Sequence, residues 1–247
     1  MRVVFVHGAC VRDGSWWWHR TAALLAERGV PSVAPLLPSC GEVGVPGGSD
    51  GPGLAEDVAA VRRVLLDGDE PTVVVAHSYG GIVTAEAAAG VGSVRHLVLV
   101  SSYLPEVGQS LSDFSGDAGP APFLEADQAA GTFGVRPELF VDTFLADCDP
   151  EDQEQAAEHL APQSVRVTGQ PVGASAWRQM PSTYVVCTED RGTPAALQRR
   201  FAERAGHVVE IDAGHHPFLS QPAAVRDLLL GLAGSTPEGQ PQNPLPA

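Results

Sequence analysis

The sequence has little cysteine and lacks the common motifs of metal and cofactor sites. Its four cysteines, Cys10, Cys40, Cys148 and Cys187, form no C-x-x-C pair and no metal-ligand spacing. Neither a dinucleotide-binding G-x-G-x-x-G pattern nor a phosphate-binding loop occurs. We therefore expect no metal and no cofactor. In a reducing compartment the default is four free thiols. The alternative is a Cys10–Cys40 disulfide, since both residues follow predicted core strands and can meet at the same edge of a sheet.

Positive charge is also scarce, with 15 basic residues against 30 acidic ones and a formal net charge of −15. Such a charge disfavours nucleic acid and anionic membrane surfaces as partners. No stretch approaches the roughly 20 apolar residues of a membrane span. The chain opens directly on a predicted strand, without a signal peptide's apolar segment. We expect a cytoplasmic protein whose partner is a small neutral, largely apolar molecule. The oligomeric state is not readable from the sequence.

The most informative stretch runs from Val73 to Ile82. A β-branched apolar run leads into Ala76-His77-Ser78-Tyr79-Gly80, and an alanine-rich apolar segment follows. This order predicts a buried strand, a tight turn with Ser78 at its apex, and a helix. Small residues two positions before and after Ser78 allow the strand and the helix to approach closely. A serine in such a turn exposes its hydroxyl, and the next amide lies at a helix N-terminus. The alternative is a plain strand-to-helix connection.

Strand and helix patterns alternate along most of the chain. Apolar strands are predicted at 2–6, 32–37, 72–77, 97–100, 183–187 and 208–211, with helices at 15–29, 54–66, 82–90, 194–204 and 222–232. This alternation predicts an α/β fold with a mainly parallel sheet of about six strands. The predicted core covers 1–104 and 181–234. Residues 105–180, with short helical pieces at 123–130, 137–145 and 150–160, are predicted to form a helical cap insertion. Residues 235–247 are predicted to be a disordered tail.

Polar side chains follow the ends of several predicted strands: His7, Ser78, Ser102, Asp190 and His215. Ligands of parallel sheets bind beyond the carboxyl ends of the strands, so these residues are expected at one edge. A serine nucleophile needs a base, and the base needs a group to orient it. His215, in a Gly-His turn after the last strand, is the expected base.

The other histidines near this edge are assigned lesser roles. His216 is the fallback base, and it is expected to shape the pocket or to point outward. His77 is expected to point away from Ser78, and His7 to make a structural hydrogen bond. The helix beginning near Trp16 is expected to have Ser15 as its N-cap.

For the acid, the chain order Ser…Asp/Glu…His favours Asp190, which directly follows a strand. Its neighbour Glu189 should point away, and Asp212 is too close to His215 in sequence. The other usual position for the acid, after the strand at 97–100, carries Ser101 and no carboxylate.

The amides of Ala9 and Tyr79 are predicted to form an oxyanion hole, since one follows the first strand and the other follows the nucleophile. The substrate pocket is expected to involve the side chains Cys10, Trp16, Tyr103 and His216.

These motifs resemble the α/β-hydrolase superfamily, and within it the group of plant methyl-salicylate-type esterases, hydroxynitrile lyases and similar bacterial esterases. The matching segments are Phe5-Val6-His7-Gly8-Ala9-Cys10, Ala76-His77-Ser78-Tyr79-Gly80-Gly81, Ser102-Tyr103-Leu104-Pro105, Cys187-Thr188-Glu189-Asp190 and Ala213-Gly214-His215. They span nearly the whole chain apart from the tail, while the cap is not specific. The resemblance implies an α/β-hydrolase fold, a Ser78-Asp190-His215 triad and a cap over an apolar pocket.

The sequence departs from the lyase branch of that group at two positions. Hydroxynitrile lyases carry a threonine and a lysine beside the triad, and the matching residues here are Gly8 and His216. The resemblance therefore favours a serine hydrolase that cleaves a small or medium neutral carboxylic ester through an acyl-enzyme. The alternatives are a lactonase or a hydroxynitrile-lyase-like C–C lyase on the same triad, and a non-catalytic small-molecule-binding homologue.

Overall fold

A six-stranded sheet forms the centre of the computed structural model, which describes residues 1–45, 47–114 and 121–234. Its order is β2-β1-β3-β4-β8-β9, and every neighbouring pair is parallel. The strands are β1 (Arg2–Val6), β2 (Ser32–Val33), β3 (Thr72–His77), β4 (Val94–Val100), β8 (Ser182–Cys187) and β9 (His207–Ile211). The predicted parallel sheet of six strands is confirmed, although β2 is shorter than the predicted 32–37. The predicted tail at 235–247 lies outside the described residues.

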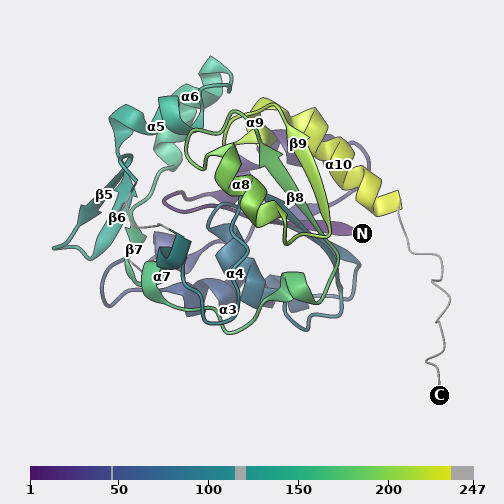
Figure 1. Cartoon of the computed structure of the whole chain (residues 1–247), viewed down its shortest axis with the longest axis horizontal. Coiled ribbons are helices and arrows are strands. Elements are labelled where there is room, and N and C mark those ends of the chain that lie inside the picture. Colours follow the sequence, from purple (N-terminus) through teal and green to yellow (C-terminus); the bar gives the residue numbers. More distant parts are fainter. Residues whose placement is uncertain (46, 115–120, 235–247) are drawn as a thin grey trace.

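Helices cover both faces of this sheet (Figure 1). One face carries α3 (Leu54–Leu66), α4 (Gly80–Ala87) and α8 (Ala195–Ala202), and the other carries α2 (His19–Ala26) and α10 (Pro222–Gly234). Successive side chains of a strand point to opposite faces. In β3, Val74 and Ala76 accordingly pack into the first core, whereas Val73 and Val75 pack into the second. Among the described residues, no helix has both the length and the hydropathy needed to cross a membrane.

The predicted helix at 15–29 is two helices, α1 (Gly14–Trp17) and α2, with Trp18 between them. Asp13, rather than Ser15, caps α1 by accepting a hydrogen bond from the amide of Trp16. The break separates the three tryptophans, because Trp17 and Trp18 are buried whereas Trp16 is partly exposed. The Trp18 ring stacks on Phe5 on the side of the sheet covered by α2.

The insertion between 105 and 180 contains strands as well as helices. β5 (Leu124–Asp127), β6 (Thr132–Val135) and β7 (Gln163–Ser164) form a second, antiparallel sheet. The predicted helix at 123–130 is therefore wrong, since this segment is one arm of a hairpin. Its partner strand, β6 at 132–135, lies outside the segment whose spacing predicted the helix. The predicted helices at 137–145 and 150–160 correspond to α5 (Pro137–Phe144) and α6 (Pro150–Ala156).

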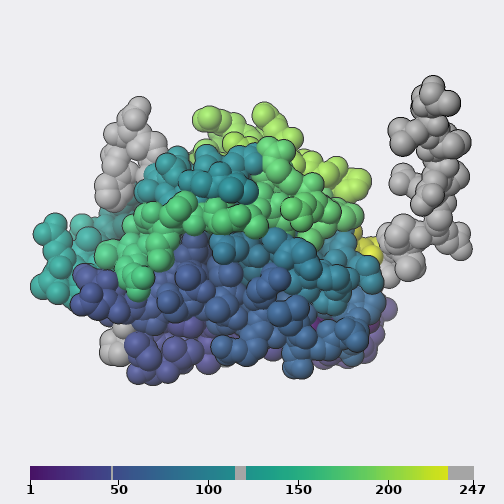
Figure 2. All heavy atoms as spheres, turned by 90° about the horizontal axis from the view of Figure 1, so that it is seen from below, coloured from purple at the N-terminus to yellow at the C-terminus, as the bar shows by residue number. Residues whose placement is uncertain are grey.

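The end of the insertion, at 163–178, packs on the side of the core that carries α3 and α4, and Figure 2 shows it as a green band bordering the blue part of the chain. Hydrogen bonds tie it to the core and to the first residue of the insertion. The Leu54 amide donates to Gln170 Oε1 at 2.6 Å, and the Gly173 amide donates to Glu86 Oε2 at 2.8 Å. Trp177 Nε1 donates to the carbonyl of Pro105. These bonds fix 163–178 to the core beneath the cavity described below.

Candidate active site

Ser78 stands at the turn between β3 and α4 and has a φ of 50°. This left-handed conformation is uncommon for a residue other than glycine, and it marks a strained turn. The turn is also tightly packed, because a Cβ on Gly80 would lie 2.5 Å from the carbonyl oxygen of Val6. The predicted strand, tight turn and helix are therefore all present. The prediction that a small residue is needed two positions after Ser78 is confirmed.

Asp190 and His215 meet at the carboxyl ends of β8 and β9. Asp190 Oδ2 lies 2.7 Å from His215 Nδ1, and both side chains are buried. Because a carboxylate accepts, Nδ1 of His215 carries the proton of this hydrogen bond. The imidazole therefore turns its other nitrogen, Nε2, away from the acid. His215 lines the same cavity as Ser78.

Four further donors surround the Asp190 carboxylate. Oδ2 accepts from Ser101 Oγ at 2.5 Å and from Gln198 Nε2 at 3.0 Å. Oδ1 accepts from the amides of Gly192 at 2.8 Å and Thr193 at 2.9 Å. Burial by itself raises the pKa of Asp190, but the charge and hydrogen bond of His215 and the bonds from Ser101 and Thr193 outweigh it. The pKa lies below its ordinary value, so the carboxylate is ionised at neutral pH.

Ser101 and Gln198 are partners of Asp190 that the sequence analysis did not assign. Ser101 follows β4, where such sheets can carry the acid, and its φ of 42° is again left-handed. Gln198 lies on α8, which begins shortly after Asp190. The sequence did contain a signal for Ser101, because this serine follows β4, the other position at which such sheets can carry the acid. Gln198 had no comparable signal.

Two backbone N–H groups beside Ser78 have no acceptor in the described part of the chain. Within residues 1–45, 47–114 and 121–234, the amides of Ala9 and Tyr79 make no hydrogen bond. Both residues line the cavity with Ser78. Unpaired donors in such a place are unusual, since most backbone groups shielded from water are paired. Gly8, next to Ala9, is also close to the serine, because a Cβ there would lie 3.1 Å from Ser78 Cβ.

A buried hydrogen-bond network lies behind these two amides. The Tyr79 hydroxyl donates to Asp57 Oδ2 at 2.8 Å, and Ser39 donates through Oγ to Oδ2 at 2.5 Å and through its amide to Oδ1 at 2.9 Å. Gln163 Nε2 donates to Ser39 Oγ at 2.9 Å, and its Oε1 accepts from the amide of Cys10 at 3.0 Å. The network therefore joins Tyr79, on α4's side of the serine, to the loop that carries Ala9. The sequence analysis assigned none of Ser39, Asp57 and Gln163.

His7 and Glu42 form a buried ion pair under the same loop. His7 Nε2 lies 2.9 Å from Glu42 Oε2, and Nδ1 lies 2.9 Å from the carbonyl oxygen of Gly8. Both ring nitrogens thus face acceptors, which favours the doubly protonated imidazolium. Burial lowers the pKa of His7, but the hydrogen bond and charge of Glu42 raise it more, so the pKa lies above its ordinary value. The structural role predicted for His7 is confirmed.

A cavity of about 900 Å³ lies between the edge of the sheet and the cap. Of the predicted pocket residues, Cys10, Tyr103 and His216 line it. Trp16 does not, and this prediction is wrong: its ring stacks on His159 at 4.2 Å, and the adjacent Trp17 faces the cavity instead. Successive residues of a helix point about 100° apart, so only one of the two can face inward.

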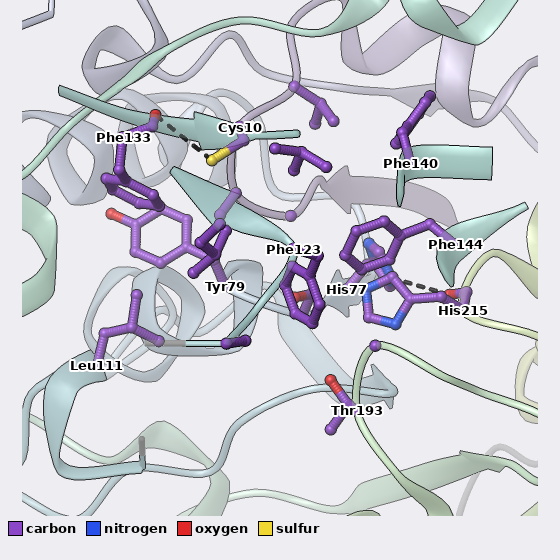
Figure 3. A pocket seen from close by; sticks show the side chains of 18 of the residues that line it. Cys10, His77, Tyr79, Leu111, Phe123, Phe133, Phe140, Phe144, Thr193 and His215 are labelled. Carbon is purple, nitrogen blue, oxygen red and sulfur yellow. Dashed lines mark hydrogen bonds between the residues drawn. The ribbon is translucent and has the colours of Figure 1, made fainter. Parts of the chain in front are cut away.

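Five phenylalanines contribute to the wall: Phe114, Phe123, Phe133, Phe140 and Phe144. Figure 3 shows Phe123 and Phe144 on the cap side of His215, and Phe133 next to Tyr79 and Cys10. The Cys10 thiol lies 3.7 Å from the carbonyl oxygen of Phe133, and all four cysteines are free. The Cys10–Cys40 disulfide considered above is therefore not formed.

His77 lies in the site, contrary to the expectation that it points away. Its Nε2 donates to the backbone carbonyl of His215 at 3.0 Å, and the two rings lie 4.4 Å apart (Figure 3). The turn after β9 lies over the end of β3, and the side chain of His77 therefore contacts this turn. Burial, together with the charges of His215 and His216, holds the pKa of His77 well below its ordinary value. His77 is therefore a neutral donor that holds the backbone of His215.

The fold and this geometry define an α/β enzyme whose polar groups gather at the carboxyl edge of a parallel sheet, beneath a cap. Residues 3–228 match the Alpha/beta hydrolase family, and the chain belongs to that family. Probable hydrolase R7 of Phoma sp. is 31% identical over 87% of this chain and 91% of its own. Methylesterase 9 of Arabidopsis thaliana is 27% identical over 95% of this chain and 98% of its own.

A solved structure with the same fold is that of a pyrethroid hydrolase from Sphingobium faniae JZ-2. It superposes with a TM-score of 0.82 at 21% identity and covers 95% of this chain and 98% of its own. The family expected from the sequence motifs is confirmed. The chain is an enzyme of the ester-hydrolase class.

Proposed function

We propose that the chain hydrolyses a neutral, largely apolar carboxylic ester through an acyl-enzyme. Ser78 Oγ attacks the ester carbonyl, and His215 accepts the serine proton and then delivers it to the leaving alcohol. Water, activated by the same imidazole, attacks the acyl-serine and releases the acid. Asp190 holds His215 in the required tautomer and stabilises its imidazolium form. The amides of Ala9 and Tyr79 stabilise the oxyanion.

The observation that carries this proposal is the 2.7 Å contact between Asp190 and His215, a residue that lines the same cavity as the strained Ser78. The two unpaired amides support it, since an oxyanion hole needs donors that no protein group already occupies. The cavity supports the substrate class, because pockets that bind ligands of drug size have volumes of roughly 300–1,000 Å³. A volume of about 900 Å³ favours a substrate of medium or larger size over a small one.

Two residues favour hydrolysis over lyase chemistry. A threonine side chain at Gly8 would press on Ser78 and on His77, which lies 3.1 Å from the added Cβ, and glycine leaves that space for a tetrahedral intermediate. The lysine of the lyase branch is replaced by His216, and burial lowers the pKa of this residue to about 3. His216 is therefore uncharged at neutral pH and supplies no cation for cyanide.

The test is hydrolysis of short-chain p-nitrophenyl esters, with fluorophosphonate labelling, by the wild type and Ser78→Ala. We expect turnover and labelling in the wild type and neither in the variant. Labelling without turnover would mean that the serine is activated but that the enzyme acts on another substrate. Lactones, which are cyclic esters, would then be assayed next. The absence of both in the wild type would contradict the proposal and favour the non-catalytic binding protein.

A further inference from the structure

His216 is a polar side chain of the cavity that the proposed mechanism does not use. Its Nδ1 lies 3.0 Å from the backbone carbonyl oxygen of Phe144. A carbonyl only accepts, so Nδ1 carries the proton of this hydrogen bond. A neutral imidazole has one N–H, and its second nitrogen is an acceptor. Nε2 of His216 therefore holds a lone pair.

The surroundings of His216 keep the ring neutral and fix its orientation. Trp17 stacks on one side with the ring centroids 4.9 Å apart, and His77 and His215 lie 4.9 Å and 5.1 Å away. Burial and the neighbouring charge of His215 lower its pKa to about 3, although the nearby Asp190 acts in the opposite direction. At neutral pH the side chain is a fixed acceptor and not a cation.

This acceptor has no partner among the described residues. In the part of the chain that the structure describes, Nε2 of His216 makes no hydrogen bond. The side chain is only 5% exposed, and it lines the cavity. The neighbouring histidines differ in this respect, because His77 Nε2 already donates to a carbonyl and His215 Nε2 serves Ser78 in the proposed mechanism. Nε2 is not among the fully buried side-chain atoms that lack a partner, so it opens to the cavity, where a ligand can supply the donor.

We propose that His216 Nε2 accepts a hydrogen bond from a hydroxyl or amide N–H that the substrate carries next to its ester carbonyl. The inference rests on the proposed function and narrows its substrate to esters of this kind, with an otherwise apolar body. In a cavity with mainly apolar walls, a few fixed polar groups orient the ligand, and His216 is one of them. Because it lies beside His215, the acceptor selects groups close to the reacting carbonyl and not at the far end of the substrate.

Three esters of nearly equal size test the proposal: methyl mandelate, which has a hydroxyl beside the carbonyl, its O-methyl ether, which cannot donate, and methyl phenylacetate, which lacks the oxygen. The rate constant kcat/KM is measured for the full-length wild type, His216→Phe and His216→Gln. Phenylalanine keeps the stacking on Trp17 without an acceptor, and glutamine restores an acceptor oxygen. Thr193→Val is the matched control, because Thr193 is another polar side chain in the cavity wall (Figure 3).

We expect the wild type to prefer the hydroxy ester over its ether by about tenfold or more, as for a buried hydrogen bond with one partner removed. The preference should vanish in His216→Phe, return in part in His216→Gln and persist in Thr193→Val. An equal preference in the wild type and His216→Phe would overturn the proposal. So would equal slowing of all three esters, which would assign His216 to packing or to holding the hydrolytic water.

Failure of this inference is distinguishable from failure of the proposed function. If Ser78→Ala retains turnover or phosphonate labelling, the serine mechanism itself is wrong. If the wild type labels but turns over none of the three esters, the same ratio is measured from their protection of Ser78 against labelling. Equal protection by the hydroxy ester and its ether would then overturn the role of His216, while the serine mechanism would stand.

Discussion

Two buried polar clusters flank Ser78 along the order of the sheet, and each is built around a carboxylate. The acid cluster, at the ends of β4, β8 and β9, consists of Ser101, Asp190, Gln198 and His215. The oxyanion cluster, beside β1 and β3, consists of Ser39, Asp57, Tyr79 and Gln163. Both carboxylates accept several hydrogen bonds in the protein interior, but they differ in the kind of donor.

Asp190 faces a histidine that can become a cation, whereas Asp57 faces only uncharged donors. The pKa of Asp190 is accordingly lowered, while burial raises the pKa of Asp57 despite the hydrogen bonds from Ser39 and Tyr79. A carboxylate next to an imidazole stabilises charge that develops during a reaction, and one among neutral donors fixes positions. The oxyanion cluster also includes a cap residue, Gln163 on β7, whereas the acid cluster is built from the core alone.

The largest expected effect comes from Asp190→Asn, which keeps the shape of the acid cluster but removes its charge. The new amide group can donate toward His215 Nδ1 and so favours the wrong tautomer. We expect kcat for p-nitrophenyl esters to fall by about 10⁴-fold, the size seen when a triad aspartate is replaced in this way. Circular dichroism and the melting temperature report whether the variant is folded. A folded variant with wild-type kcat would remove Asp190 from the mechanism.

A smaller effect on rate but a clear effect on stability is expected for Asp57→Ala. The change leaves the amide and hydroxyl of Ser39 and the hydroxyl of Tyr79 without their acceptor. We expect the free energy of unfolding, from urea denaturation, to fall by about 3 kcal/mol. We also expect kcat to fall more than KM rises, since Tyr79 carries one oxyanion amide.

The matched control for that variant is Ser164→Ala. Ser164 Oγ is buried and donates to the carbonyl of Gly48 at 2.7 Å, so it ties the cap to the core without reaching Tyr79. We expect a loss of about 1 kcal/mol and an unchanged kcat. If both variants lower kcat equally, the oxyanion cluster acts only by holding the cap.

The acid cluster was largely predictable from the sequence, and the oxyanion cluster was not. Asp190 and His215 each follow a strand, and parallel strands end at one edge, so local patterns place them together. The bonds of the oxyanion cluster join residues 22 positions apart for Tyr79 and Asp57, and 124 positions apart for Gln163 and Ser39. Those residues carry no motif, and tertiary packing alone brings them together.

The same limit explains the errors in the cap and at the cavity wall. The segment at 123–130, which contains β5, is predicted as a helix because its apolar spacing fits either structure until a partner strand is known. Whether Trp16 or Trp17 faces inward depends on where α1 begins, and helix boundaries are the least certain part of a sequence-based prediction. His77 enters the site because the turn after β9 folds over it, which no local pattern records.

His216 and His7 are expected to respond to acid in opposite ways. The expected change in the free energy of unfolding is smaller than that for Asp57→Ala. The pKa of His216 is about 3 in the folded chain against an ordinary 6.5. The unfolded chain therefore binds more protons below pH 6.5, and stability falls as the pH falls. His7 has a raised pKa, so its stabilisation is complete below 6.5 and is lost only as the pH rises through its folded value.

We expect the free energy of unfolding of His216→Phe to fall by about 2 kcal/mol less than that of the wild type between pH 7 and pH 5. Urea denaturation at the two pH values measures this difference. Equal slopes in the two proteins would mean that His216 is protonated in the folded chain, against its assignment as a neutral acceptor.

The smallest effect on kcat is expected at Ser101 in the acid cluster. Two substitutions there distinguish the loss of a hydrogen bond from the relief of backbone strain. Ser101 donates to Asp190 and has a φ of 42°, which favours glycine. Ser101→Ala and Ser101→Gly both remove the donor, and four donors to Asp190 remain, so we expect kcat to fall by less than about tenfold in each. Only the glycine variant relieves the left-handed backbone, by about 1 kcal/mol. It should therefore unfold at higher urea concentration than the alanine variant while having the same kcat. If kcat followed stability instead, the conformation of the turn after β4, and not the hydrogen bond to the acid, would set the contribution of Ser101.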